Sequence, residues 1–160
     1  MTLSFESEGA LCAAAAAAAT GWRDSGVSPL LVGLNGDLGV GKTTWVRAML
    51  GGLGHTGRVP SPTFTLLEHY EIGSLTVVHL DLYRLAAASE FEYLGLRDWL
   101  SLPKVWLLAE WPERGGNFAD SLDLELLLRS DLDDRRLLQP KARTERGRQA
   151  LKAWLERDIK

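Results

Sequence analysis

The stretch Gly36-Asp37-Leu38-Gly39-Val40-Gly41-Lys42-Thr43 decides the fold of this 160-residue chain. It satisfies the P-loop pattern, in which a glycine and four variable residues precede Gly-Lys-Thr. An apolar run at residues 30–34 precedes it and a helical pattern at residues 42–53 follows it, which is the strand–loop–helix context that the motif requires. Average residue usage gives a chance match in fewer than about one such chain in a hundred. The segment therefore predicts a phosphate-binding loop.

The residue types of this loop suit a nucleoside triphosphate with Mg²⁺. Glycines let the backbone turn tightly and bring its amides to phosphate oxygens, and the following helix adds the partial positive charge of its N-terminus. Lys42 is expected to reach the outer phosphates, and the hydroxyl of Thr43 is expected to be a magnesium ligand. The sequence has no Asn-Lys-x-Asp guanine-reading motif, which favours ATP over GTP.

A second part of the site must supply an acid that holds magnesium or orients an attacking water. Asp81 and Glu110 each stand at the carboxyl end of an apolar strand, where they can face the loop across the sheet crevice. Spacing alone does not rank them. His79 is either a general base or a partner in a structural hydrogen bond. Arg84 is either a charge-stabilising finger or a member of a salt bridge.

Along the rest of the chain, strand-like and helix-like segments alternate, which indicates an α/β sheet. The helices expected are an alanine-rich one that begins after a polar start at residues 4–9 and stops near Thr20-Gly21, an amphipathic one at 89–100 bent near Gly95, and a closing one at 144–158. The strands expected are 64–72 and 75–82, joined by a hairpin at Gly73-Ser74, then 105–109, and 122–128 with its hairpin partner 136–140, while 51–62 and 112–116 are expected to be loops. We predict a single P-loop ATPase domain over residues 1–160, with a three-layer P-loop NTPase-like fold and a mixed, mainly parallel central sheet.

Composition sets the wider limits. With 18 basic and 21 acidic residues the formal net charge is −3, which does not favour nucleic-acid binding through a general positive field. A single cysteine allows no intramolecular disulfide and favours a reducing, cytoplasmic compartment. The longest apolar stretch, residues 11–19, is short of the about 20 residues of a membrane span, so no membrane association is expected. The late basic residues, at 135–148, are interleaved with acids and predict a solvated face.

Several segments occur in the order seen in one known family. They are residues 36–44, Ser61-Pro62-Thr63-Phe64-Thr65-Leu66, His79-Leu80-Asp81-Leu82-Tyr83-Arg84-Leu85, Gly95-Leu96-Arg97-Asp98 and Glu110-Trp111-Pro112-Glu113. Over residues 5–128 the sequence resembles the TsaE family, also called YjeE, the bacterial ATPase needed to make threonylcarbamoyladenosine in transfer RNA. In relatives the position before Ser61 is often lysine, whereas here it is Pro60.

The resemblance implies roles for individual residues. Glu110 matches the family's magnesium-associated acid beside Thr43, and Asp81 then matches the catalytic, water-orienting carboxylate, with Lys42 as the second catalytic group. Thr63 lies in a switch-like loop where its hydroxyl would sense the terminal phosphate, and Trp111 lies either against the nucleotide or in the core. The residues implied to contact ATP are Glu8, Asp37, Leu38, Gly39, Val40, Gly41, Lys42, Thr43, Thr44, Thr63 and Trp111.

The family also implies a function with partners. The chain is expected to hydrolyse ATP with Mg²⁺, weakly alone and faster with the TsaD and TsaB subunits, in the modification of the adenosine next to the anticodon. Whether it touches transfer RNA directly is left open. Two alternatives are a small P-loop kinase, although no arginine-rich lid is evident, and a nucleotide-gated binding protein with negligible turnover.

Overall fold

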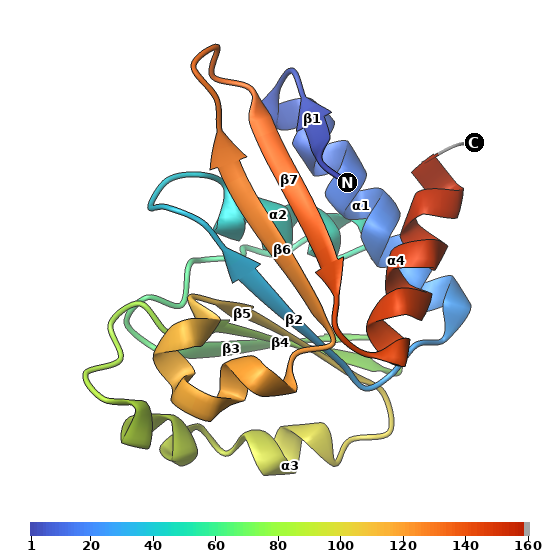
Figure 1. Ribbon diagram of the computed structural model, residues 1–160. Helices are drawn as coiled ribbons and strands as arrows, with labels where there is room; N and C mark the ends of the chain where they lie inside the picture. The colour runs from blue at the N-terminus through green and yellow to red at the C-terminus, as the bar shows by residue number, and fades with distance from the viewer. Residues whose placement is uncertain (159–160) are drawn as a thin grey trace.

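A seven-stranded sheet forms the centre of the computed structural model, which describes residues 1–158 (Figure 1). The strands lie in the order β1-β7-β6-β2-β5-β4-β3. The four strands β6, β2, β5 and β4 pair in parallel, and the outer pairs β1–β7, β7–β6 and β3–β4 are antiparallel. Their bounds are β1 Leu3–Phe5, β2 Leu30–Asn35, β3 Leu67–Ile72, β4 Leu75–Asp81, β5 Val105–Glu110, β6 Leu124–Ser130 and β7 Arg136–Ala142.

Helical segments cover both faces of this sheet. Helices α1 (Glu8–Ser25), α2 (Lys42–Gly52) and α4 (Glu145–Asp158) pack on one face, where their apolar side chains join those of the strands in one core cluster. The 3₁₀ segments η1 (Ala88–Leu94) and η2 (Pro112–Ser121) and the short helix α3 (Leu96–Leu100) lie on the other face around a second cluster. The predicted three-layer α/β fold with a mixed sheet is confirmed.

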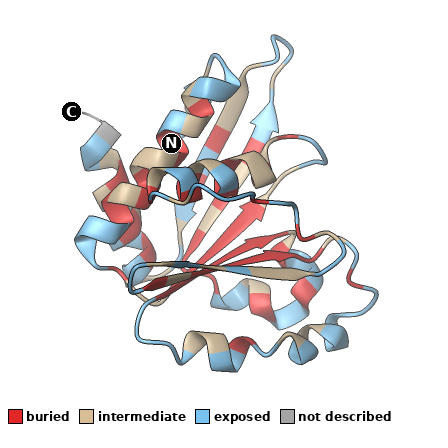
Figure 2. Cartoon of the chain, turned by 180° about the vertical axis from the view of Figure 1, so that it is seen from behind, coloured by how far each residue is buried: buried red, intermediate tan, exposed pale blue. Residues whose placement is uncertain are grey.

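Burial explains why the central strands appear as unbroken apolar runs. All six residues of β5 and five of the six in β2 are buried, because helical segments cover them from both sides (Figure 2). The edge strand β3 instead alternates between partly buried and exposed residues. Both hairpins, at Gly73-Ser74 and between β6 and β7, form as predicted.

Helix α1 is longer than predicted. It begins after the Ser7 N-cap, whose hydroxyl accepts from the Ala10 amide at 3.1 Å, but it continues through Gly21 to Ser25. Gly21 is a packing residue and no stop signal, since a Cβ there would lie 2.6 Å from the Ala153 carbonyl of α4. The true end is Gly26, which takes the left-handed conformation at φ 71° that commonly terminates helices.

Other boundaries also differ from the prediction. The strand β1 was not expected, because three residues carry too short a pattern; it forms by pairing with β7. Strand β3 begins at Leu67 instead of 64. The loop expected at residues 112–116 is part of a 3₁₀ segment, Pro112–Ser121, with a kink at Gly116. The segment 89–100 breaks at Gly95 as predicted, but its first half is a 3₁₀ helix.

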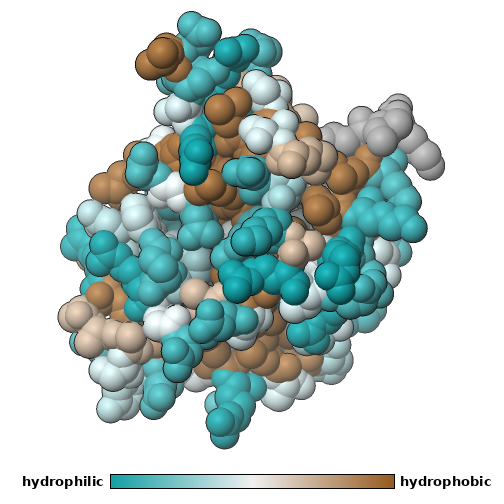
Figure 3. All heavy atoms as spheres, in the orientation of Figure 1, coloured by the Kyte–Doolittle hydropathy of each residue, from teal (hydrophilic) through white to brown (hydrophobic). Residues whose placement is uncertain are grey.

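Most of the late basic residues, Lys141 excepted, are paired with acids of the described chain. Arg143 lies 3.0 Å from Glu125, and Arg146 contacts the fully buried Asp123 at 3.2 Å. In α4, Arg148 pairs with Glu145. Hydrophilic side chains cover much of the face that contains α4 (Figure 3). These contacts agree with a solvated face for Arg143, Arg146 and Arg148, whereas Arg136, which the same prediction covered, lines the cavity described below.

Among residues 1–158, no helix has the length and apolar character needed to cross a membrane.

We expect Gly36→Ala to destabilise the protein by about 2–4 kcal/mol, because a Cβ would meet the Leu128 carbonyl and the backbone has a strained φ for any other residue. The clash distance to the Leu128 oxygen is 2.4 Å and the φ of Gly36 is 146°. Urea denaturation measures the loss. Gly51→Ala in α2 is the control, since its Cβ meets nothing within 4 Å and should leave stability unchanged or raise it by up to about 1 kcal/mol. Equal stabilities of the two variants would contradict the prediction.

Candidate functional site

A cavity of about 450 Å³ opens at the carboxyl ends of β4 and β5, beside the loop that follows β2. This is the position where open α/β sheets bind ligands. Both charged and apolar side chains surround it. Its lining residues are Glu8, Leu11, Leu38, Gly39, Gly41, Lys42, Thr43, Thr44, Ser61, Thr63, Asp81, Tyr83, Arg84, Glu110, Trp111 and Arg136.

The start of α2 presents free backbone amides to this cavity. Gly41 is the N-cap and offers no side-chain hydrogen bond, so the amides of the first helical turn have no cap within the chain. The helix dipole adds partial positive charge at the same point. The loop and helix together form a cradle for an anion.

The Lys42 side chain folds back over the loop. Its ammonium donates to the carbonyls of Gly36 at 2.6 Å and Asp37 at 2.8 Å, and lies 4.3 Å from the ring centre of Trp111. Burial lowers the pKa of Lys42, while the nearby carboxylates of Glu110 and Asp81 act in the opposite direction. A desolvated cation held by neutral groups is placed to bind an incoming anion.

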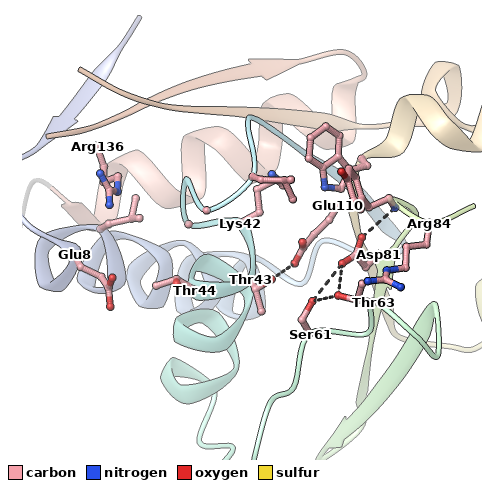
Figure 4. A pocket seen from close by; sticks show the side chains of 16 residues that line it. Glu8, Lys42, Thr43, Thr44, Ser61, Thr63, Asp81, Arg84, Glu110 and Arg136 are labelled. Atoms are coloured by element: carbon pink, nitrogen blue, oxygen red, sulfur yellow. Dashed lines mark hydrogen bonds between the residues drawn. The ribbon is translucent and has the colours of Figure 1, made fainter. Parts of the chain in front are cut away.

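Thr43, Glu110 and His79 form a chain of hydrogen bonds at the base of the cavity. The Thr43 hydroxyl donates to Oε1 of Glu110 at 2.7 Å, and Nε2 of His79 lies 2.9 Å from the same oxygen. Glu110 is 3% exposed and His79 is fully buried. The contact fixes the carboxylate next to the first turn of α2 (Figure 4).

Asp81 holds the loop that carries Ser61 and Thr63. Its Oδ2 accepts from the hydroxyls of Ser61 and Thr63, each at 3.2 Å, and its Oδ1 accepts from the Tyr83 amide at 3.1 Å. The backbone of the same loop bonds back to β4, since the Asp81 amide donates to the Leu66 carbonyl at 3.0 Å. Asp81 is 4% exposed, yet its hydrogen-bond partners are all neutral.

Strand alternation brings the two acids together. In β4, Val78 packs on the face of the sheet that η1 and η2 cover, whereas Val77 packs on the face that α2 covers. Since side chains alternate along a strand, His79 and Asp81 lie on the same face as Val77. Asp81 pairs in register with Glu110 of β5. The acids that the sequence could not rank thus lie side by side, with Glu110 in contact with Thr43.

Most of the residues predicted for the site line the cavity, and two do not. Asp37 is exposed and supplies only its backbone carbonyl to Lys42, and Val40 is 6% exposed and packs in the core cluster below the loop. The contacts of Asp37 and Val40 with the nucleotide stay a prediction, in which the loop backbone would make the contact. Trp111 is partly buried and faces Lys42, so it belongs to the cavity wall.

The sequence analysis gave no site role to four lining residues, Leu11, Ser61, Tyr83 and Arg136. Arg136 is the first residue of β7 and lies opposite Phe5 of β1 in the sheet. Its side chain lines the cavity although it lies far from the P-loop in sequence. Its only sequence signal was the hairpin pairing of β7 with β6. Figure 4 shows Arg136 and Glu8 on one side of Lys42 and Thr43, and Asp81, Ser61 and Thr63 on the other.

Arg84 lines the cavity, and its guanidinium lies 4.5 Å from the ring centre of Phe64. Within residues 1–158 it forms no salt bridge. The alternative that placed Arg84 in an ion pair is therefore not supported.

A strand, a glycine-rich loop, a helix with a free N-terminus and a buried lysine define this chain as a P-loop nucleotide-binding protein. The sequence model of the family described as threonylcarbamoyl adenosine biosynthesis protein TsaE matches residues 5–138. The chain belongs to the TsaE family, as the resemblance over residues 5–128 implied.

Individual relatives agree with this assignment. The Haemophilus influenzae protein named tRNA threonylcarbamoyladenosine biosynthesis protein TsaE is 43% identical over 126 residues, which are 78% of each chain. The Bacillus subtilis protein of the same name is 38% identical over 103 residues, covering 64% of this chain and 63% of the relative. The crystal structure of Bacillus subtilis YdiB superposes with a TM-score of 0.74 over 99% of this chain and 95% of that one, at 24% identity, and supports the fold.

Proposed function

We propose that this chain is a Mg²⁺-dependent ATPase that sustains threonylcarbamoyladenosine formation in transfer RNA, acting in the cytoplasm with TsaD and TsaB. The family supports the pathway. One observation carries the enzymatic part: Lys42, the Thr43–Glu110 pair and the buried Asp81 converge on a single cavity at the P-loop. A binding loop alone would not need two buried carboxylates beside an anion cradle.

The positions of the side chains suggest how ATP lies in the cavity. The phosphates would take the amides at the start of α2 and the Lys42 ammonium, because these are the positive groups at its centre. The terminal phosphate would then face Thr63 and Asp81, and the ribose and adenine would lie toward Glu8 and Arg136. Trp111 would close the cavity beside Lys42.

The oxygen groups beside α2 fit Mg²⁺. Thr43 Oγ1 and the Glu110 carboxylate are hard oxygen donors 2.7 Å apart, and this ion prefers a few such ligands completed by phosphate oxygens and water. Within residues 1–158, Glu110 Oε2 has no hydrogen-bond partner, while Oε1 has two. Bound there, Mg²⁺ would neutralise charge that develops on the phosphates during transfer.

Asp81 is the group best placed to orient the attacking water. It is a buried carboxylate at the end of β4 that faces the predicted terminal phosphate. At present Ser61 and Thr63 occupy its Oδ2. A water would compete with these two hydroxyls for Oδ2, so we expect turnover to be weak in the isolated chain and faster with a partner that moves the loop.

We expect Thr43→Ala to lower the affinity for Mg²⁺ at saturating nucleotide by about tenfold to a hundredfold, as typical for loss of an interaction at a metal site. Nucleotide affinity in EDTA should change little, because the phosphate-binding amides remain. Thr43→Ser keeps the hydroxyl and is the matched control. Isothermal titration with Mg²⁺ measures the difference, and equal affinities of the alanine and serine variants would remove Thr43 from the metal site.

Phosphate release from Mg-ATP tests the proposed function. The purified chain is assayed alone and with TsaD and TsaB, and Lys42→Ala gives the background. Stimulation by the partners supports the proposal. Transfer to an added small acceptor would instead favour the kinase, and tight ATP binding without turnover in either mixture would favour the gated binder.

A further inference from the structure

His79 is a fully buried histidine with only one of its two ring nitrogens in use. Nε2 lies 2.9 Å from Oε1 of Glu110, and Nδ1 is buried with no hydrogen-bond partner among the described residues. With Glu110 as a carboxylate, which only accepts, this contact requires the tautomer in which Nε2 carries the proton and donates. The ring reaches diagonally across the β4–β5 pair, because its opposite neighbour in register is Leu108.

The unpaired nitrogen argues against packing as the reason for a histidine at this position. A buried polar atom without a partner destabilises the folded state, and the neighbours of His79 on the same face of the sheet, Val77 in β4 and Leu108 opposite it in β5, are apolar and equally buried. A leucine at position 79 would suit this environment better. The benefit of the imidazole must therefore lie in what it does to Glu110.

The hydrogen bonds of Glu110 are divided unequally between its two oxygens. Oε1 accepts from both the Thr43 hydroxyl and the His79 ring, and these two contacts fix the orientation of the carboxylate plane. Within residues 1–158, Oε2 has no such partner. A carboxylate held in this way offers one pre-oriented oxygen to a cation at the cavity without losing side-chain freedom on binding.

We propose that His79 is a positioning residue for the metal ligand: it holds Glu110 so that the site binds Mg²⁺ tightly, and it has no part in proton transfer. The inference rests on the proposed function, since it requires Mg²⁺ at Thr43 and Glu110. For His79, this positioning role is a third possibility beside a general base and a purely structural hydrogen bond.

The test compares wild type with His79→Leu, His79→Gln and His55→Leu. A fluorescent ATP analogue is titrated in EDTA, Mg²⁺ is then titrated at saturating analogue, and thermal unfolding is followed without ligand. We expect His79→Leu to weaken Mg²⁺ binding about tenfold to a hundredfold. Its affinity for the ATP analogue in EDTA should stay within about twofold of wild type, a difference of only about 0.4 kcal/mol. Its melting temperature should lie no more than about 4 °C below that of wild type. His79→Gln keeps an N–H donor and should recover most of the Mg²⁺ affinity.

His55 is the matched control because its Nε2 is also buried with no partner among residues 1–158, while its ring packs on Tyr70 away from the cavity. His55→Leu should bind Mg²⁺ as wild type does. If His79→Leu binds Mg²⁺ like wild type, or loses stability while keeping Mg²⁺ affinity, the positioning role is wrong and the proposed function stands. If Mg²⁺ does not affect nucleotide binding even in wild type, both are overturned.

Discussion

Lys42→Ala is expected to weaken Mg-ATP binding by about a hundredfold or more, because each hydrogen bond between charged groups contributes about 1.5–3 kcal/mol and this ammonium would make several to the outer phosphates. The cation is already desolvated, with its pKa lowered by burial, and its direct contacts are two backbone carbonyls and an aromatic ring, with the carboxylates of Glu110 and Asp81 nearby. The change removes the central positive group of the cavity. Isothermal titration with Mg-ATP measures the loss.

Lys141→Ala is the matched control for this change, since Lys141 is an exposed lysine of β7 that does not line the cavity. It should bind Mg-ATP as wild type does. Circular dichroism verifies that Lys42→Ala remains folded. An unchanged titration curve for Lys42→Ala would show that the phosphates bind elsewhere.

Asp81→Asn is expected to keep nucleotide affinity within about threefold and to lose turnover by about a hundredfold to ten-thousandfold, the usual contribution of a group that takes or directs a proton in the transition state. Asparagine preserves the size of the side chain and one oxygen acceptor. The change removes the charge and with it the ability to polarise a water, and it replaces one acceptor oxygen by an NH₂ donor. Partner-stimulated phosphate release and a parallel binding titration separate the two effects.

Asp120→Asn supplies the control, because Asp120 is an exposed acid of η2 outside the cavity lining. It should not change either quantity. If Asp81→Asn lowers Mg-ATP affinity as strongly as it lowers turnover, Asp81 belongs to the metal site instead of orienting water.

The phosphate cradle could be predicted from the sequence because the P-loop is local. Its glycines, Lys42 and Thr43 are contiguous, and the strand before them and the helix after them form where expected. The central strands could be recognised for the same reason, since burial on both faces makes them continuous apolar runs.

Features that depend on contacts distant in sequence were harder to predict. The end of α1 was placed too early because Gly21 looked like a stop signal, and only its contact with the Ala153 carbonyl of α4 shows otherwise. Arg136 was assigned to a solvated face because nothing near it in sequence indicates that β7 delivers it to the cavity.

Asp81 and Glu110 could be predicted only in part. Apolar strands ending in Asp81 and Glu110 were recognisable, but the register that places them side by side, and the Thr43 contact that distinguishes Glu110, exist only in the folded sheet. The roles of both acids stay predictions. The sequence could not decide between a general base and a structural hydrogen bond for His79, because only the folded structure shows the 2.9 Å distance between its Nε2 and Glu110.

The threonylcarbamoyladenosine content of transfer RNA tests the central claim most directly. Cells depleted of their own TsaE protein would carry this chain or its Asp81→Asn variant at equal expression, and the modified adenosine would be quantified by mass spectrometry of digested transfer RNA. We predict that the wild-type chain restores the modification and Asp81→Asn does not. Full restoration by Asp81→Asn would contradict an account in which this site supports the modification by hydrolysing ATP.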